Sequence, residues 1–141
     1  MAKEIGPTHD DLVVVTGAGG FIGGHLIHEL RRLGHTRLRA VDIKPLETWY
    51  QHFPGVDNRQ LDLRDRAACD AAAAGSREIY NLACDMGGMG FIETHKAECM
   101  ISVLINTHML MAARDAGAQR YFYSSSACVY AAQKQIGRAH V

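Results

Sequence analysis

Apolar residues follow two different spacings along this chain. Short runs rich in β-branched and aromatic residues alternate with stretches in which apolar residues recur every three or four positions. Continuous apolar runs are typical of buried strands, whereas the spacing of three or four is typical of amphipathic helices. Residues 12–15 are the clearest such run, and further strands are predicted at 37–41, 59–63, 78–83 and 120–124.

The helical spacing predicts a helix in each of three stretches between these strands. The first helix carries apolar residues from Ile22 to Leu33, and the second is the alanine-rich segment 66–74. The third helix is longer and follows residue 91. Its predicted buried face consists of Cys99, Met100, Val103, Leu104, Thr107, Leu110 and Met111. Glycines that can cap a helix end follow all three, at Gly34, Gly75 and Gly117.

Strands and helices therefore alternate from residue 12 to residue 126, which predicts an α/β fold. Because crossovers between parallel strands are right-handed, the fold is expected to be a Rossmann-like, doubly wound parallel sheet with helices on both faces. The domain is expected to span 12–135, after a polar leader at 1–11. Residues 136–141 (IGRAHV) look like translated sequencing-adapter DNA and are expected to be a non-native tail.

A glycine turn follows the first strand and precedes the first helix. Gly17, Gly20 and Gly23 recur at every third position. Such a turn brings bare backbone close to a pyrophosphate, and the helix N-terminus adds N–H groups and the positive end of its dipole. The second strand ends in Asp42, nineteen positions after Gly23, where a dinucleotide-binding unit places its ribose-binding carboxylate. Histidine follows Gly24, so the Gly-Lys-Ser/Thr of a triphosphate-binding loop is absent.

Composition and charge narrow the class of protein. The chain has 141 residues, which suits one domain, and 15 basic residues balance 15 acidic ones. We therefore expect no nucleic-acid partner, and no apolar run is long enough to predict a membrane span. Four scattered cysteines predict free thiols in a reducing, cytoplasmic protein. His25 and His28 lie three apart on a helix, too few to predict a metal site.

Three loops near the predicted carboxyl edge of the sheet stand out. Residues 43–56 form a long loop in which Trp49, Tyr50 and Phe53 are expected to pack as a small cluster. Residues 85–91 (DMGGMGF) hold three glycines and two methionines directly after a strand, so they can approach a ligand closely. Serines 124–126 end the fifth strand, where a substrate would sit in an α/β fold; a merely polar strand end is an equally good interpretation.

Taken together, TGAGGFIG, Asp42, Asp62-Leu63, NLA and SSSACVY resemble the extended short-chain dehydrogenase/reductase family, the NAD-dependent epimerases and dehydratases of nucleotide sugars. The segment DMGGMGF together with SSAC is similar to the branch formed by GDP-mannose 3,5-epimerases and their bacterial relatives. The resemblance covers roughly residues 12–134. It implies NAD as cofactor, a nucleotide sugar such as a GDP-hexose as substrate, and a homodimer for the full-length parent.

Site residues carry over from this resemblance by position. It implies that NAD contacts Gly17, Gly20, Phe21, Ile22, Gly23, Asp42, Asp62, Leu63, Leu82 and Ala83. Met86 and Gly87 would approach the sugar. Ser126 would hydrogen-bond the hydroxyl being oxidised, and Cys128 would be an acid/base group.

The chemistry explains why a cysteine suits this reaction. Protons on hexose carbons 3 and 5 are not acidic until carbon 4 is transiently oxidised to a ketone. A thiol, with an ordinary pKa of about 8.5, can then exchange protons near neutral pH. Taken without the resemblance, Cys128 is better interpreted as a small buried apolar residue.

The chain also departs from that family. The family's Tyr-x-x-x-Lys pair should come some tens of residues after SSAC, beyond residue 141. Tyr130 and Lys134 have the right spacing but lie too close to Ser126 and Cys128. The resemblance therefore implies the N-terminal, cofactor-binding part of an enzyme, itself inactive. A dehydratase or another epimerase of the same family, or a non-catalytic NAD-binding module, remains an alternative.

Overall fold

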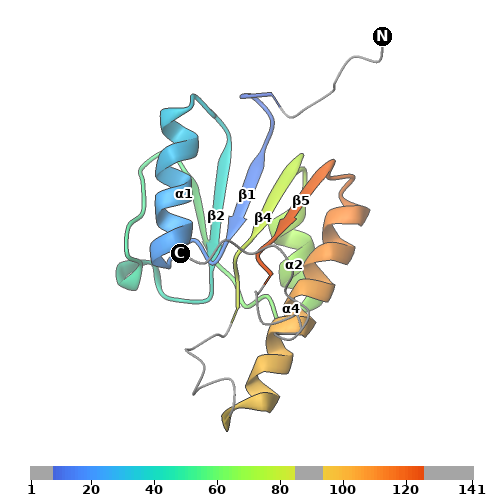
Figure 1. Cartoon of the computed structure of the whole chain (residues 1–141). Helices are drawn as coiled ribbons and strands as arrows, with labels where there is room; N and C mark the ends of the chain where they lie inside the picture. The colour runs from blue at the N-terminus through green and yellow to red at the C-terminus, as the bar shows by residue number, and fades with distance from the viewer. Residues whose placement is uncertain (1–7, 85–93, 126–141) are drawn as a thin grey trace, which may run out of the picture.

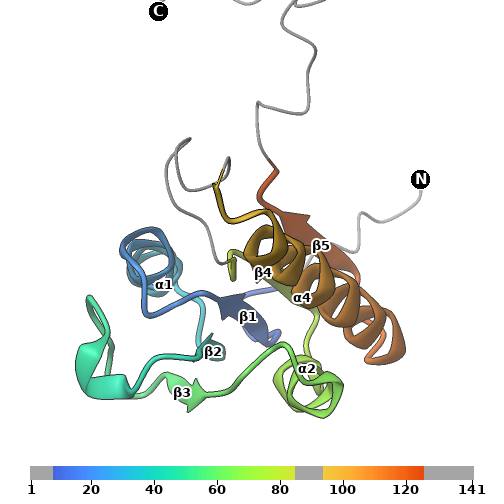
Figure 2. The same cartoon turned by 90° about the horizontal axis from the view of Figure 1, so that it is seen from below.

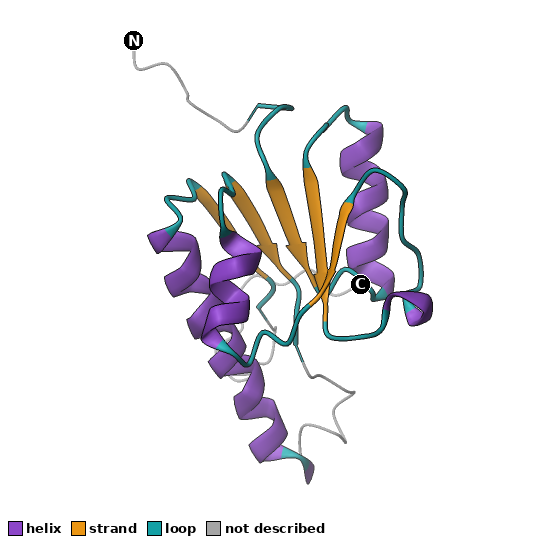
Figure 3. Ribbon diagram, turned by 180° about the vertical axis from the view of Figure 1, so that it is seen from behind, coloured by secondary structure: helices purple, strands orange, loops and turns teal. Residues whose placement is uncertain are grey.

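A computed structural model of the chain describes residues 8–84 and 94–125, without the side chains of Lys96, Glu98 and Cys99. It contains one parallel sheet in the order β3-β2-β1-β4-β5 (Figures 1 and 3). The strands are β1 (Val13–Thr16), β2 (Leu38–Asp42), β3 (Asp57–Gln60), β4 (Glu78–Asn81) and β5 (Arg120–Tyr123). The strand order reverses between β1 and β4, which is where open α/β sheets bind ligands.

Helices cover both faces of this sheet, as expected for a Rossmann-like fold. Helix α1 (Phe21–Arg32) lies on one face, and α2 (Arg66–Ala73) and α4 (Lys96–Asp115) lie on the other (Figure 2). A short 3-10 turn, η1 (Leu46–Thr48), interrupts the loop after β2. No helix in the described part of the chain is long and apolar enough to cross a membrane.

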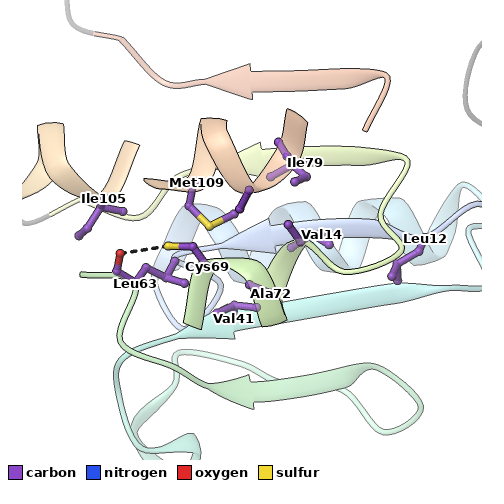
Figure 4. Close-up of a cluster of buried hydrophobic side chains, with 12 residues drawn as sticks. Leu12, Val14, Val41, Leu63, Cys69, Ala72, Ile79, Ile105 and Met109 are labelled. Atoms are coloured by element: carbon purple, nitrogen blue, oxygen red, sulfur yellow. Dashed lines mark hydrogen bonds between the residues drawn. The ribbon is translucent and has the colours of Figure 1, made fainter. Parts of the chain in front are cut away.

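Two apolar clusters separate the sheet from its helices. The side chains of β1 alternate between them, because successive residues of a strand point to opposite faces. Val14 joins Ile79 and Met109 on the α2–α4 side, where the Cys69 thiol also donates to the Leu63 carbonyl at 3.1 Å (Figure 4). Val13 and Val15 join Ile27 and Trp49 on the α1 side. The central strand is therefore buried on both faces.

Strand bounds differ from the expectations by one to three residues. The third strand ends at Gln60 instead of residue 63, and the fourth ends at Asn81 instead of residue 83. In both cases one further backbone hydrogen bond joins the residue after the strand to the neighbouring strand. The Leu61 N–H donates to the Asp42 carbonyl, and the Leu82 N–H donates to the Thr16 carbonyl. The residues removed from the strands thereby become walls of a cavity.

The predicted buried face of the long helix is wrong. Five of its residues are 39–63% exposed: Met100, Val103, Leu104, Leu110 and Met111. The buried residues of α4 are Ile105, Met109, Ala112 and Ala113. Apolar residues surround most of this helix, so spacing alone did not identify the packed side. Small alanines on α4 and α2 join Ile105 and Met109 in one cluster, while the five exposed residues lie outside it. Cys99 lies outside the described side chains.

The expected aromatic cluster in the loop after β2 is confirmed only in part. Trp49 is buried against the α1 side of the sheet and Phe53 packs at its margin, whereas Tyr50 is exposed. Tyr50 instead meets Phe21 and His25 at the start of α1, with ring centroids 5.0 and 5.6 Å away. These contacts fasten the loop to α1.

Candidate functional site

A cavity of about 380 Å³ opens at the carboxyl ends of the strands. Its walls come from the turn after β1, from the segments following β2, β3 and β4, and from α4. The lining residues are Gly17, Gly20, Asp42, Ile43, Lys44, Leu61, Asp62, Leu63, Arg64, Leu82, Ala83, Cys84, Ile101 and Ile105. The cavity therefore spans the point where the strand order reverses.

Backbone atoms pack too closely against Gly17 and Gly23 of the glycine turn for either to carry a side chain. Gly17 has φ +69°, and a Cβ there would lie 2.7 Å from the Leu82 carbonyl oxygen. A Cβ on Gly23 would lie 2.3 Å from the Gly17 oxygen, whereas one on Gly20 would meet only that atom, at 3.4 Å. The start of α1 thus packs against the turn after β1, and this turn packs against the segment after β4. Gly20 lies on the cavity wall.

Gly20 is the N-cap of α1 and offers its first turn no side-chain hydrogen bond. That turn also contains no acidic residue. The first N–H groups of a helix lack partners within the helix and carry the positive end of its dipole. A phosphate group against this turn would supply the missing acceptors.

Asp42 lies beneath the turn and is 8% exposed. Its two oxygens accept from the Gly19 N–H at 2.9 Å and the Lys44 N–H at 3.0 Å. An ionised carboxylate has about four acceptor positions, so this side chain retains capacity for about two more donors. A Cβ on Gly19 would lie 2.8 Å from the Trp49 ring and 3.0 Å from the Asp42 carboxyl carbon. The need for glycine at this position was not predicted from the sequence.

At the end of β3, Asp62 and Arg64 form an ion pair on the cavity wall. The Arg64 Nε lies 2.9 and 3.0 Å from the two Asp62 oxygens. Hydrogen bonds from the Arg64 side chain hold the pKa of the Asp62 carboxyl below its usual range. Asp62 is therefore fully ionised at neutral pH.

A polar network inside the fold holds the segment after β4. The Thr16 hydroxyl donates to Asn81 Oδ1 at 2.6 Å, and Asn81 Nδ2 donates to Asn106 Oδ1 at 3.2 Å. Tyr121 completes the network, because its hydroxyl donates to the same Asn106 oxygen at 3.0 Å. The network joins β1, β4, α4 and β5, and Thr16 Oγ1 also accepts from the Ala83 N–H at 3.3 Å. It thereby fixes the backbone of a cavity wall.

Replacing Tyr121 with phenylalanine is expected to lower the free energy of unfolding by about 1 kcal/mol, the usual worth of one buried hydrogen bond. Burial raises the pKa of this phenol to about 12, so it remains a donor at neutral pH. Urea denaturation measures the change. Tyr123→Phe is the control, because Tyr123 is half-exposed on the same strand. Equal effects of the two substitutions would contradict the role given to the network.

The structure brings seven of the ten expected cofactor residues to the cavity: Gly17, Gly20, Asp42, Asp62, Leu63, Leu82 and Ala83. Gly23 lies behind the wall, where it allows α1 to approach the turn. Phe21 and Ile22 are 61% and 69% exposed, so only their backbone belongs to the turn. Met86, Gly87, Ser126 and Cys128 lie outside the described residues.

Several cavity and support residues were not found from the sequence. Three of them line the cavity within two positions of an expected residue: Lys44, Arg64 and Cys84. Closeness in the sequence to an expected residue was the signal that could have identified them. Ile101 and Ile105 reach the cavity from α4, and Asn106 supports it through the network. Nothing local marked these three, because their partners belong to other elements. Within the described ranges, no three His, Cys, Asp or Glu side chains gather to hold a metal ion.

Comparison with known proteins gives consistent matches. Residues 13–140 match the NAD dependent epimerase/dehydratase family. The chain is 39% identical over 135 residues to GDP-mannose 3,5-epimerase 1 of Oryza sativa subsp. japonica, covering 95% of this chain and 35% of that protein. It is 37% identical over 140 residues to GDP-mannose 3,5-epimerase of Arabidopsis thaliana, covering 99% and 37%. The chain thus spans about a third of the length of these relatives.

Among solved structures, the chain resembles MoeE5 in complex with UDP-glucose and NAD. The TM-score is 0.71 and the sequence identity is 31%, with 84% of this chain and 38% of that chain covered. The described fold is accordingly the N-terminal part of a larger α/β architecture.

Proposed function

Because this chain belongs to the NAD-dependent epimerase/dehydratase family, we propose that it is the NAD-binding part of a nucleotide-sugar epimerase acting on a GDP-hexose. The observation that carries the proposal is the cavity in which the glycine turn and the Asp42 carboxylate meet. The substrate class rests on the relatives of 37–39% identity, which are GDP-mannose 3,5-epimerases. Conversion of such a sugar in the longer protein is the proposed activity, and the chain alone is proposed to be inactive.

Three features of the cavity support NAD as its ligand. The Gly17–Gly20 backbone and the start of α1 would hold the pyrophosphate, because both glycines line the cavity at the positive end of the helix dipole. The two remaining acceptor positions of Asp42 match the 2′- and 3′-hydroxyls of a ribose. Leu63 would lie beside the adenine, and Leu82 and Ala83 would line the path towards the nicotinamide.

The proposed chemistry assigns proton transfers to residues outside the described ranges. Bound NAD would supply reversible oxidation at sugar carbon 4, which acidifies the protons on carbons 3 and 5. Ser126 would hydrogen-bond the carbon 4 hydroxyl, and Cys128 would exchange the ring protons as an acid/base group. Met86 and Gly87 would position the sugar. In the longer protein, proposed to be a homodimer, Cys128→Ser would suppress incorporation of solvent deuterium into the sugar.

The chain is expected to bind NAD at least about tenfold more tightly than NADP, a difference of 1.4 kcal/mol. A 2′-phosphate would remove a donor and place negative charge against Asp42. Isothermal titration of the folded chain with both dinucleotides measures the ratio, and Asp42→Ala should narrow it. Equal affinities in the unmodified chain would contradict the proposal even if the Asp42→Ala variant failed to fold.

The location of bound NAD can be tested in the same chain through two cysteines. Cys84 is exposed on the cavity wall, whereas Cys69 is buried and burial raises the pKa of its thiol to about 11. NAD should slow alkylation of Cys84 by iodoacetamide at pH 8, as measured peptide by peptide with mass spectrometry. Cys69 serves as the control for folding, because it should remain unlabelled with and without NAD.

A further inference from the structure

A closed ring of hydrogen bonds holds the Asp42 carboxylate. Its oxygens accept from the Gly19 N–H at 2.9 Å and from the Lys44 N–H at 3.0 Å. The loop after β2 holds both donor residues in turn. The Trp49 indole N–H donates to the Lys44 carbonyl at 2.9 Å. The next residue along the chain, Tyr50, donates its backbone N–H to the Gly19 carbonyl at 3.0 Å. The two groups that orient Asp42 therefore both depend on this short piece of loop.

Trp49 also packs beside the carboxylate. The two residues are 7% and 8% exposed, and both lie against Gly19. A Cβ on Gly19 would lie 2.8 and 2.9 Å from Cδ1 and Cγ of the indole, and 3.0 Å from the carboxyl carbon of Asp42. Since Asp42 also lines the cavity, its remaining acceptor positions are offered to the cavity and not to the loop.

We propose that Trp49 is a positioning residue that fixes the Asp42 carboxylate for a ribose diol, and that it thereby strengthens the discrimination between NAD and NADP. The inference rests on the proposed binding of NAD and concerns how the loop after β2 contributes to it. A carboxylate that is already immobilised loses little conformational entropy when it accepts two hydroxyl groups. It also cannot rotate away from a 2′-phosphate, so the repulsion of like charges is retained.

The substitution Trp49→Phe tests the hydrogen bond with little change in the packing on Gly19. Phenylalanine retains Cγ and Cδ1, the indole atoms that lie nearest Gly19, but it has no N–H for the Lys44 carbonyl. Affinity for NAD should fall about fivefold, the effect of losing one hydrogen bond. Affinity for NADP should change little, because its 2′-phosphate makes no favourable bond with Asp42. Isothermal titration with both dinucleotides measures the ratio, which should become smaller.

Phe53→Leu is the matched control within the same loop. Phe53 packs at the margin of the same apolar cluster as Trp49. Its ring lies 4.9 Å from the Arg31 guanidinium carbon and 5.8 Å from the His28 ring, and it takes no part in the bonds to Asp42. This substitution should lower the melting temperature and leave the ratio of the two affinities unchanged. If Trp49 only supported the fold, both variants would keep the ratio of the unmodified chain.

A second measurement needs no substitution at Trp49. It is the single tryptophan of the chain, so its indole N–H gives one resonance in a nitrogen-15 NMR spectrum. Coupling between two binding events is reciprocal: if the indole bond strengthens the binding of NAD, bound NAD must strengthen the indole bond. Saturating NAD should therefore slow exchange of this hydrogen with solvent more than saturating NADP does. Equal slowing by the two dinucleotides would overturn the inference, even if Trp49→Phe failed to fold.

Failure of this inference can be told apart from failure of the proposed function. If neither dinucleotide binds the folded, unmodified chain, both are overturned. If NAD binds more tightly than NADP and folded Trp49→Phe keeps the same ratio of affinities, only the role of Trp49 is overturned. Thermal melts establish that each variant is folded before it is titrated.

Discussion

Gly23→Ala is expected to lower the free energy of unfolding by about 3 kcal/mol and to abolish NAD binding. The added Cβ would lie 2.3 Å from the Gly17 oxygen and 2.7 Å from the Ala18 Cα. Both are backbone atoms of the turn, so relief requires moving α1 away from β1. Overpacking of a rigid site costs in this range. Urea denaturation and isothermal titration measure the two effects.

Two other glycines provide matched controls for this substitution. Gly55 has φ +82° with nothing within 4 Å of an added Cβ, so Gly55→Ala carries only the cost of the left-handed backbone, about 1–2 kcal/mol. Gly20→Ala meets its nearest atom at 3.4 Å and should fold, but its methyl group enters the cavity wall and should weaken NAD. If Gly23→Ala retained the stability and NAD affinity of the unmodified chain, the close packing of Gly23 on Gly17 and Ala18 would contribute to neither.

Arg39→Ala should also lower the free energy of unfolding, by about 2–3 kcal/mol, because it removes a charged donor from carbonyl groups at the end of α2. Arg39 lies on β2 and is 8% exposed. Its Nη1 donates to the carbonyls of Ala72 and Ala74 at 2.8 and 2.9 Å, and its Nε pairs with Asp57. The guanidinium thus satisfies the C-terminal carbonyls of α2 and complements the negative end of its dipole. Truncation would leave those carbonyls without their partner.

Arg59 gives the control, because it pairs with the same Asp57 carboxylate from a more exposed position. Arg59→Ala should cost less than about 1 kcal/mol, as most exposed ion pairs do. Urea denaturation measures the free energy of unfolding of both variants. Equal losses in the two would contradict the importance given to the burial of Arg39.

The pH dependence follows from Asp57. Hydrogen bonds from Arg59 and Arg39 lower its pKa, so its contribution is present above the unfolded value of 3.8 and is lost as pH falls through the lower folded value. The difference in free energy of unfolding between the unmodified chain and Arg39→Ala should therefore become smaller below pH 3.8. It should not vanish, because in the unmodified chain Arg39 still donates to the carbonyls of α2.

The glycine turn and Asp42 could be predicted from the sequence because their signals are local. Gly17, Gly20 and Gly23 are separated by three residues, and each apolar run is short enough to be recognised alone. Alternation of strands and helices then left a parallel sheet as the fold, which the structure confirms. Asp62 and Arg64 are also close in sequence, yet their pairing was not predicted, because spacing does not specify which acceptor an arginine takes.

The sequence by itself determined the order of the strands and helices along the chain and the turn that starts the site. Tertiary structure decided which side of α4 is buried, how Arg39 caps α2, and how Thr16, Asn81, Asn106 and Tyr121 connect. Those bonds join residues far apart in the chain: 65 positions separate Thr16 from Asn81, and 33 separate Arg39 from Ala72. A local pattern predicts an element from its own periodicity. The partner of a buried polar group, in contrast, is selected only when the elements pack and every donor must find an acceptor.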